Sequence, residues 1–91
     1  MDNHPLVIVI VLTWNSIADA AACLAALRDS AYPNFRVLVV DNGSDDGTPE
    51  SVATHFPEFQ LVRLSRNIGY VGGNNVGLRR AVAGGADYVL L

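Results

Sequence analysis

Four apolar stretches divide the chain, and segments rich in polar residues and glycine separate them. They cover Leu6–Leu12, Phe35–Val40, Gln60–Leu64 and Asp87–Leu91. The first two are apolar without alternation, which is typical of strands buried on both faces of a parallel sheet. The third is shorter and carries Arg63, so we expect an edge strand there. The pattern therefore predicts four β-strands.

The segment after the first strand has helical spacing. Its apolar residues recur at intervals of three and four, which predicts one core-facing stripe made of Ile17, Ala20, Ala21, Leu24 and Leu27. Asn15 or Ser16 can cap this helix. Cys23 lies within it, and we expect a small buried apolar side chain there.

Two further helices are predicted from their boundary residues. Thr48–Pro49 is a favourable start, because Thr caps a helix and Pro occupies the first turn, where its missing N–H is not needed. The proline at 57 blocks this helix beyond residues 55–56. We expect the third helix to begin near Gly73 or Asn74 and to end at Gly84-Gly85.

Strands and helices thus alternate along the whole chain. This alternation implies a parallel sheet with right-handed crossovers. From the habit of such folds we expect the strand order 3-2-1-4, with a topological switch between the first and fourth strands. The prediction is an α/β fold with an open, parallel, Rossmann-like sheet, in one domain over residues 1–91.

Charge and composition narrow the possible functions. The formal net charge is −3 and all six basic residues are arginines. No basic face is visible, so we expect no nucleic-acid partner. Without lysine, the chain supplies neither a P-loop lysine nor a Schiff base. The apolar run at 6–12 follows Asp2 and His4 rather than basic residues, so it reads as a strand and not as a signal peptide.

Three polar loops should meet at one edge of the sheet, because each follows a strand and the carboxyl ends of parallel strands share an edge. They are Thr13–Ser16, Asp41–Asp46 and Arg66–Asn75. Asp41 ends a buried strand, and its carboxylate can accept a hydrogen bond from the N–H of a purine or pyrimidine ring. The alternative is that Asp41 only accepts N–H groups of its own turn. We favour the ligand, because two other polar loops converge there.

The other loops carry further candidate contacts. Trp14 can stack on a base or wall it in, although a core position is nearly as consistent with its place after a buried strand. Asn67 offers a donor and an acceptor, and Gly69 permits backbone shapes closed to other residues. The free N–H groups of a helix opening at Gly72-Gly73-Asn74-Asn75 suit an anion or a sugar hydroxyl.

Taken together, these segments resemble the N-terminal part of a family 2 glycosyltransferase with the GT-A nucleotide-sugar fold. The resemblance rests on VIVIVLTWN (7–15), VVDNGSDDGT (39–48), NIGYVGGNNVG (67–77) and ADYVLL (86–91). Asn67-Ile68-Gly69-Tyr70 is similar to a loop of rhamnosyltransferase-like members. The fold implied is the nucleotide-binding half of a GT-A domain, truncated after its fourth strand.

The resemblance implies site residues position by position. Thr13, Trp14 and Asn15 fall in the segment that walls the base, and Asp41 matches the aspartate that contacts it. Asn67, Gly69 and Asn74 match loop positions near the nucleotide. No catalytic residue and no metal ligand is assigned within the chain. In the family, an Asp-rich motif just beyond the position of Leu91 binds Mg²⁺ or Mn²⁺, and the catalytic base and acceptor site follow it.

The implied function is transfer of a sugar from a nucleoside-diphosphate donor to an acceptor hydroxyl, with a saccharide or lipid-linked saccharide as acceptor. We expect the isolated chain to bind nucleotide weakly and to be inactive. We also expect it to self-associate through an apolar edge at Val89–Leu91, because exposed strand edges pair with other chains. The expected location is cytoplasmic, at the inner membrane face for the intact protein.

Two other functions compete with this one. A nucleotidyltransferase would usually have a basic, glycine-rich loop after the first strand, and residues 13–16 contain neither basic residues nor glycine. A non-catalytic α/β interaction module could keep the fold without the pocket. Nucleotide binding that depends on Asp41 distinguishes a pocket from such a module.

Overall fold

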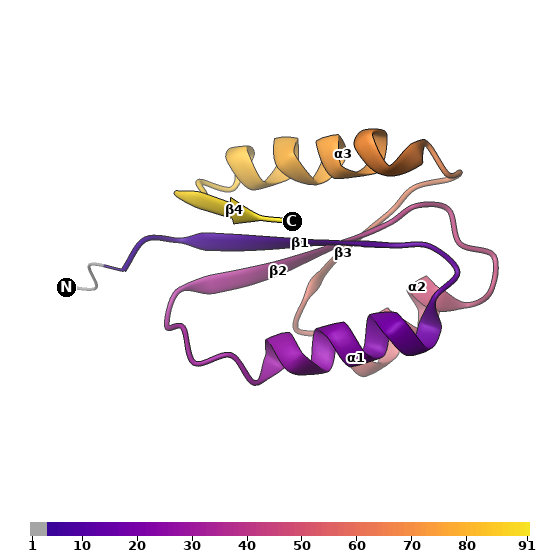
Figure 1. The fold of residues 1–91 in the computed structure, drawn as a ribbon, viewed down its shortest axis with the longest axis horizontal. Helices are drawn as coiled ribbons and strands as arrows, with labels where there is room; N and C mark the ends of the chain where they lie inside the picture. The colour runs from indigo at the N-terminus through magenta and orange to yellow at the C-terminus, as the bar shows by residue number, and fades with distance from the viewer. Residues whose placement is uncertain (1–3) are drawn as a thin grey trace.

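The computed structural model describes residues 4–91 and contains one four-stranded sheet (Figure 1). Its strands are β1 (Val7–Thr13), β2 (Phe35–Asp41), β3 (Gln60–Arg63) and β4 (Tyr88–Leu90). They are parallel and lie in the order β3-β2-β1-β4, so the predicted fold class and strand order are confirmed. The register places Thr13 beside Asp41 at the carboxyl edge.

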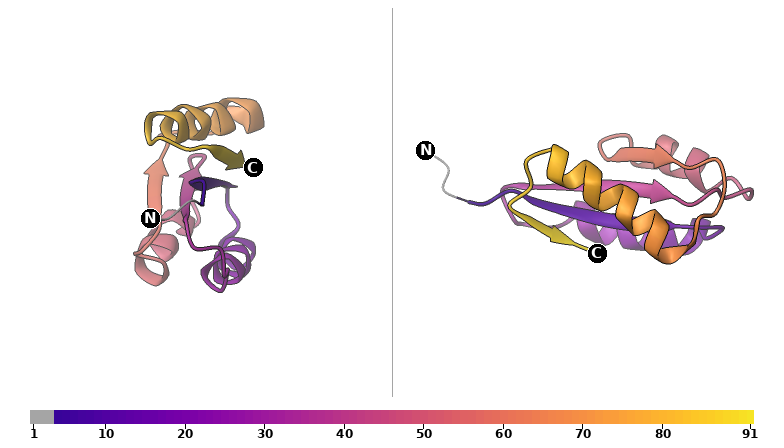
Figure 2. Two further views of the ribbon diagram at one scale, coloured as in Figure 1. Left: turned by 90° about the vertical axis from the view of Figure 1, so that its left-hand side faces the viewer. Right: turned by 90° about the horizontal axis from the view of Figure 1, so that it is seen from above.

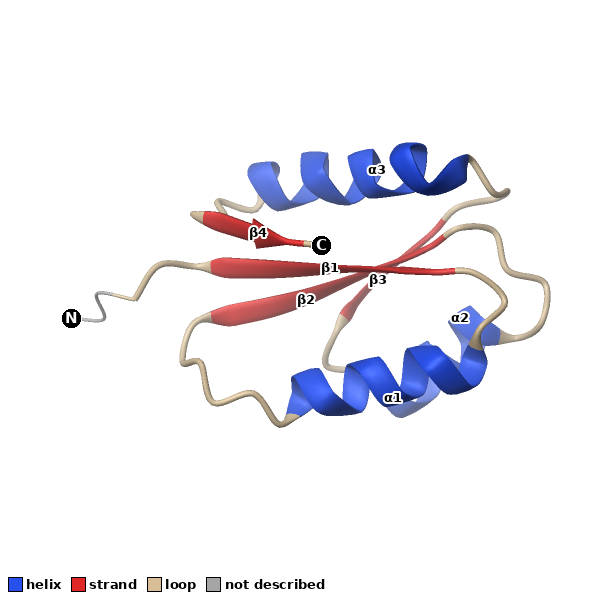
Figure 3. Ribbon diagram, in the orientation of Figure 1, coloured by secondary structure: helices blue, strands red, loops and turns tan. Residues whose placement is uncertain are grey.

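Helices cover both faces of the sheet. α1 (Ile17–Arg28) and α2 (Thr48–His55) lie on one face, and α3 (Gly69–Ala83) lies on the other (Figures 2 and 3). Each face has its own apolar cluster, one built around Leu24 and Phe56 and the other around Ile10 and Ala81.

The apolar run of β2 follows directly from this layering. Val37 and Val39 belong to the cluster under α1 and α2, whereas Leu38 and Val40 belong to the cluster under α3. All four are at most 3% exposed. Since successive side chains of a strand point to opposite faces, a strand covered on both sides has to be apolar at every position.

The stripe predicted for α1 is confirmed except at its first residue, and Ala21 and Leu27 pack against the same cluster as Leu24. Ala20 and Leu24 are buried, but Ile17 is 41% exposed at the first turn. Cys23 is exposed, against the buried position that we expected. It is the neighbour of Leu24, and successive helical residues point about 100° apart, so burial of Leu24 turns Cys23 away from the sheet.

α3 begins at Gly69, four residues before the predicted start. Gly73, where we expected the helix to begin, and Gly77 both lie inside α3 and allow it to approach β1 closely. A Cβ atom on Gly73 would lie 2.5 Å from Cδ1 of Leu12, and one on Gly77 would lie 2.6 Å from Cγ2 of Ile10. Gly73 and Gly77 are therefore packing positions. Asn74 was predicted near the start of the helix, but α3 begins five residues before it.

The start of α2 differs from the predicted cap. Gly47, in the left-handed region, is the capping position, and Thr48 is the first helical residue. Oδ1 of Asp46 accepts hydrogen bonds from the N–H of Thr48 at 2.9 Å and from its hydroxyl at 2.5 Å. Asp46 thus supplies the acceptor that we had assigned to Thr48. Pro49 lies in the first turn, as predicted.

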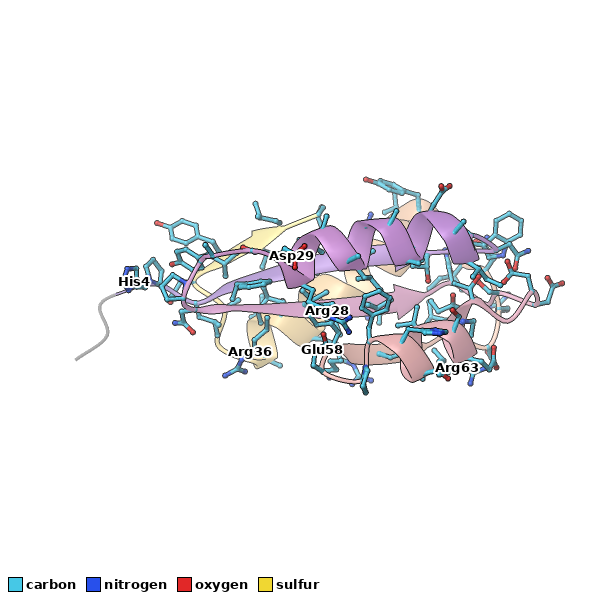
Figure 4. All side chains as sticks on the ribbon, turned by 90° about the horizontal axis from the view of Figure 1, so that it is seen from below. His4, Arg28, Asp29, Arg36, Glu58 and Arg63 are labelled. Atoms are coloured by element: carbon cyan, nitrogen blue, oxygen red, sulfur yellow. The ribbon has the colours of Figure 1, made fainter. Side chains whose placement is uncertain are left out.

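An exposed ion pair ties the end of α1 to the segment after α2. Arg28 donates to both carboxylate oxygens of Glu58, at 2.5 and 2.9 Å, and its Nη2 also donates to the carbonyl of His55 at 2.7 Å (Figure 4). The hydrogen bond from Arg28 lowers the pKa of Glu58, and Glu58 in turn raises the pKa of Arg28. This pair lies away from the carboxyl edge of the sheet.

None of the helices within residues 4–91 has the length and apolar character needed to cross a membrane.

Candidate functional site

Thr13 and Asp41 form the centre of the carboxyl edge. They end neighbouring strands in matched register, and they are 3% and 1% exposed. Oγ1 of Thr13 donates to Oδ1 of Asp41 at 2.8 Å, and the Asn42 N–H donates to the Thr13 carbonyl at 2.8 Å. The ends of the two strands are therefore joined by both side-chain and backbone hydrogen bonds.

The Asp41 carboxylate also organises its own turn. Its Oδ1 accepts a second hydrogen bond from Oγ of Ser44 at 2.7 Å, and its Oδ2 accepts from the Ser44 N–H at 2.9 Å. The turn contacts that we weighed as an alternative role are thus present. A carboxylate has about four acceptor sites, so one on Oδ2 is left for a further donor. The contact with a base stays a prediction.

The loop after β1 is fastened to the loop after β2. The Asn15 N–H donates to Oγ of Ser44 at 2.8 Å, and Oδ1 of Asn15 accepts from the Asp45 N–H at 2.9 Å. Asn15 takes a left-handed conformation, with φ of 46°, which Asn tolerates better than most residues. Trp14 is 52% exposed, so the core position considered for it is wrong, and its ring is accessible at the edge.

The loop after β3 is held at the same edge. Oδ1 of Asn42 accepts from the Ile68 N–H at 2.9 Å, and Nδ2 of Asn42 donates to the Gly69 carbonyl at 3.1 Å. Asn67 is exposed, and its Oδ1 accepts from the Gly69 N–H at 2.7 Å. Gly69 has a φ of 84°. The three loops predicted to share an edge are therefore connected around Asp41.

Asn74 is placed differently from the other candidates. It is buried in α3 and lines a pocket of about 300 Å³ together with Tyr70, Leu12 and Leu91. β1 pairs with β4 only as far as Val9, and this pocket lies beside the residues of β1 that follow Val9. A larger pocket of about 370 Å³ is formed near the amino ends of β2 and β3, and none of the predicted site residues lines it.

Sequence reasoning missed the residues that connect the loops. Asn42, Gly43 and Ser44 are residue types that favour turns, yet Ser44 also binds Asp41 and Asn42 binds the loop after β3. The available signal was an Asn-Gly pair directly after a strand-ending carboxylate. That signal indicates a turn but does not say which distant segment the turn contacts.

The described residues do not supply a metal centre. Within residues 4–91, no three or more His, Cys, Asp or Glu side chains are grouped so that they could hold an ion.

Comparison with known proteins assigns the chain to a family. Residues 8–90 match the profile described as glycosyl transferase family 2. The chain belongs to this family. Its Rossmann-like sheet is the one expected of that family. The resemblance inferred from the motifs is thus confirmed.

Two relatives show the range of the family. The glycosyltransferase AglE of Haloferax volcanii is 32% identical over 82 residues, which cover 85% of this chain and 27% of AglE. An N-acetylglucosaminyl-diphospho-decaprenol L-rhamnosyltransferase of Mycobacterium tuberculosis is 32% identical over 62 residues, covering 68% of this chain and 20% of that enzyme.

A solved structure has the same fold. It is the mannosyltransferase PcManGT from Pyrobaculum calidifontis, in complex with GDP-Man and Mn²⁺, with a TM-score of 0.74 and 33% identity. The match covers 86% of this chain and 25% of PcManGT. The chain thus spans about a quarter of the length of the relatives that it matches.

Proposed function

We propose that residues 1–91 form the nucleotide-sugar-binding part of a glycosyltransferase that transfers a sugar from a nucleoside-diphosphate donor to an acceptor hydroxyl. The observation that carries this proposal is that hydrogen bonds connect three strand-end loops, two of them through Asp41 and Ser44 and the third through the neighbouring Asn42. Ligands of open parallel sheets bind outside the carboxyl ends of the strands, which is where these loops lie. PcManGT, which shares the fold, is described in complex with GDP-Man.

The chain's own residues have distinct parts in this function. Asp41 accepts an N–H of the base through its remaining acceptor site, and Thr13 and Ser44 hold the carboxylate in place. The exposed ring of Trp14 stacks against the base, and Asn15, Asn67 and Gly69 shape the walls. Asn74 binds the nucleotide from the pocket beside β1.

Transfer itself needs groups that residues 4–91 do not provide. We propose that the intact protein uses Mg²⁺ or Mn²⁺ on ligands outside this segment and a carboxylate base for the acceptor hydroxyl, and that the 91-residue chain alone is inactive. The acceptor is a saccharide or lipid-linked saccharide, and the place of action is the cytoplasm, at the inner membrane face. Sugar transfer by the purified chain would contradict the inactivity.

Nucleotide binding can be tested with a matched pair of variants. The purified chain is titrated calorimetrically with UDP, GDP and dTDP, and we expect weak saturable binding of at least one. Asp41→Asn keeps the shape of the side chain but removes the charge and one acceptor, so affinity should fall at least about tenfold.

Asp45→Asn is the control for this experiment. It removes the same charge from the same loop, but the interaction recorded for residue 45 uses its backbone N–H. It should bind as wild type does. Equal affinities of wild type and Asp41→Asn, with both folded by circular dichroism, would favour a non-catalytic module that keeps the fold.

We further propose that the isolated chain self-associates through β4. Tyr88, Leu90 and Leu91 are 62%, 57% and 66% exposed, and among residues 4–91 β4 pairs on one side only, with β1. Light scattering should report species larger than a monomer, and Leu90→Lys should shift them toward the monomer because a charged edge resists pairing. Val82→Lys, at an apolar position on α3 that is even more exposed than Leu90, should not. A monodisperse wild-type monomer would overturn this proposal.

A further inference from the structure

The side chain of Asn42 joins the end of β2 to a segment 26 residues further along the chain. Its Oδ1 accepts from the Ile68 N–H at 2.9 Å, and its Nδ2 donates to the Gly69 carbonyl at 3.1 Å. Asn42 is 3% exposed. One amide therefore satisfies a donor and an acceptor of adjacent residues just where α3 begins, and both of its polar atoms are occupied by the protein.

Close packing on both sides limits the positions of this amide. A Cβ atom on Gly43 would lie 2.6 Å from the Asn67 backbone nitrogen, so the two loops touch backbone to backbone. A Cβ atom on Gly73 of α3 would lie 3.2 Å from Nδ2 of Asn42. The amide thus lies between the turn after β2 and the second turn of α3, and its removal would take one hydrogen bond from each of two backbone groups, the Ile68 N–H and the Gly69 carbonyl.

We propose that Asn42 is a positioning residue. It holds residues 67–69 and the first turn of α3 in the arrangement that binds nucleotide, and it does not touch the nucleotide itself. This inference rests on the proposed function, and it adds to it the residue that fixes one wall of the site relative to Asp41. An amide is required because an ionised carboxylate can only accept hydrogen bonds and has no donor for the Gly69 carbonyl.

The test uses two substitutions at this position and one control. Asn42→Ala removes both hydrogen bonds without adding charge. Asn42→Asp keeps the shape, and its carboxyl can replace the amide only when protonated, since only then does it donate to the Gly69 carbonyl. Asn34→Asp makes the same chemical change at the other end of the sheet, where Nδ2 of Asn34 donates to the His4 carbonyl.

Two quantities are measured for each protein between pH 5 and pH 8. The first is the affinity for the nucleoside diphosphate that wild type binds best. The second is hydrogen exchange of the Ile68 amide by NMR, which reports on the loop without any ligand. Asp41 and Arg66 are the charged residues next to these contacts. Wild type is therefore measured at the same pH values, so that any effect of these two residues is separated from the effect of residue 42.

We expect Asn42→Ala to bind nucleotide at least about tenfold more weakly than wild type and to lose protection at Ile68. Asn42→Asp should match Asn42→Ala at pH 8 and approach wild type at pH 5, because burial raises the pKa of its carboxyl. With each variant folded by circular dichroism at every pH, a merely structural residue would leave the affinity unchanged, whereas a positioning residue makes the affinity follow the donor at position 42. Asn34→Asp should follow wild type throughout.

Contrary results separate the inference from the function on which it rests. If Asn42→Ala loses protection at Ile68 but keeps wild-type affinity, the positioning role is wrong. If Ile68 stays protected in Asn42→Ala, the hydrogen bonds do not hold the loop and the inference fails as well. If wild type binds no nucleoside diphosphate, the proposed function is wrong. Loss of Ile68 protection in Asn42→Ala would in that case still show that Asn42 holds the loop after β3.

Discussion

Alanine in place of Gly43 should lower the free energy of unfolding by about 3 kcal/mol or more. Gly43 has a φ of 78°, a conformation that costs a residue with a Cβ atom roughly 1–2 kcal/mol. The new Cβ would also lie 2.4 Å from the carbonyl carbon of Arg66 and 2.6 Å from its Cα. These are backbone atoms, so no side-chain rotation relieves the clash, and the turn after β2 and the loop after β3 have to separate.

Gly85 provides a matched control for this substitution. Its φ is 82°, nearly that of Gly43, but a Cβ atom there would meet nothing within 4 Å. Gly85→Ala should therefore show the conformational strain alone, about 1–2 kcal/mol. Urea denaturation of both variants measures the difference, which is the energetic cost of pushing the two loops apart. Equal losses in the two variants would mean that the loops are not in contact in solution.

Leu24→Ala should lower the free energy of unfolding by about 3 kcal/mol. Leu24 is fully buried between α1 and the sheet, in the cluster that also contains Val39 and Phe56. Truncation removes apolar surface from this cluster and leaves a cavity that the surrounding strands can fill only in part. For a domain of this size the melting temperature should fall by about 12–24 °C.

The control is the same substitution in β4. Leu90 is 57% exposed, so Leu90→Ala removes little buried surface and should change the melting temperature by only a few degrees, about 4 °C at most. Calorimetry at one protein concentration compares the two variants. If both melt together, the cluster under α1 is not a packed core.

The strands could be predicted from the sequence because their environment is uniform. β2 is covered on both faces, so each of its central positions is apolar, and the run in the sequence has almost the same limits as the strand. The strand order also followed, since alternating strands and helices leave few possible arrangements of a parallel sheet. The common edge of the three loops then follows from geometry alone.

The partners within that edge could not be predicted. Asn42 and Gly43 make their decisive contacts with residues 66–69, and such contacts depend on how far α3 and β3 are shifted along the sheet. Local patterns describe a residue's neighbours in sequence, so an Asn-Gly pair after a strand indicated a turn and nothing beyond it. The start of α3 was misplaced for a similar reason, because glycines needed for close packing look like glycines needed for a turn.

The sequence by itself determined the class of fold, the family and the edge of the sheet where polar residues gather. Hydrophobic periodicity and strand-end residues are local properties, and they suffice for these conclusions. Only the tertiary structure decided that Trp14 and Cys23 are exposed, that Ser44 binds the Asp41 carboxylate and that Asn42 connects to the start of α3. Those features depend on which surfaces approach one another after the strands have paired, and no short stretch of sequence contains that information.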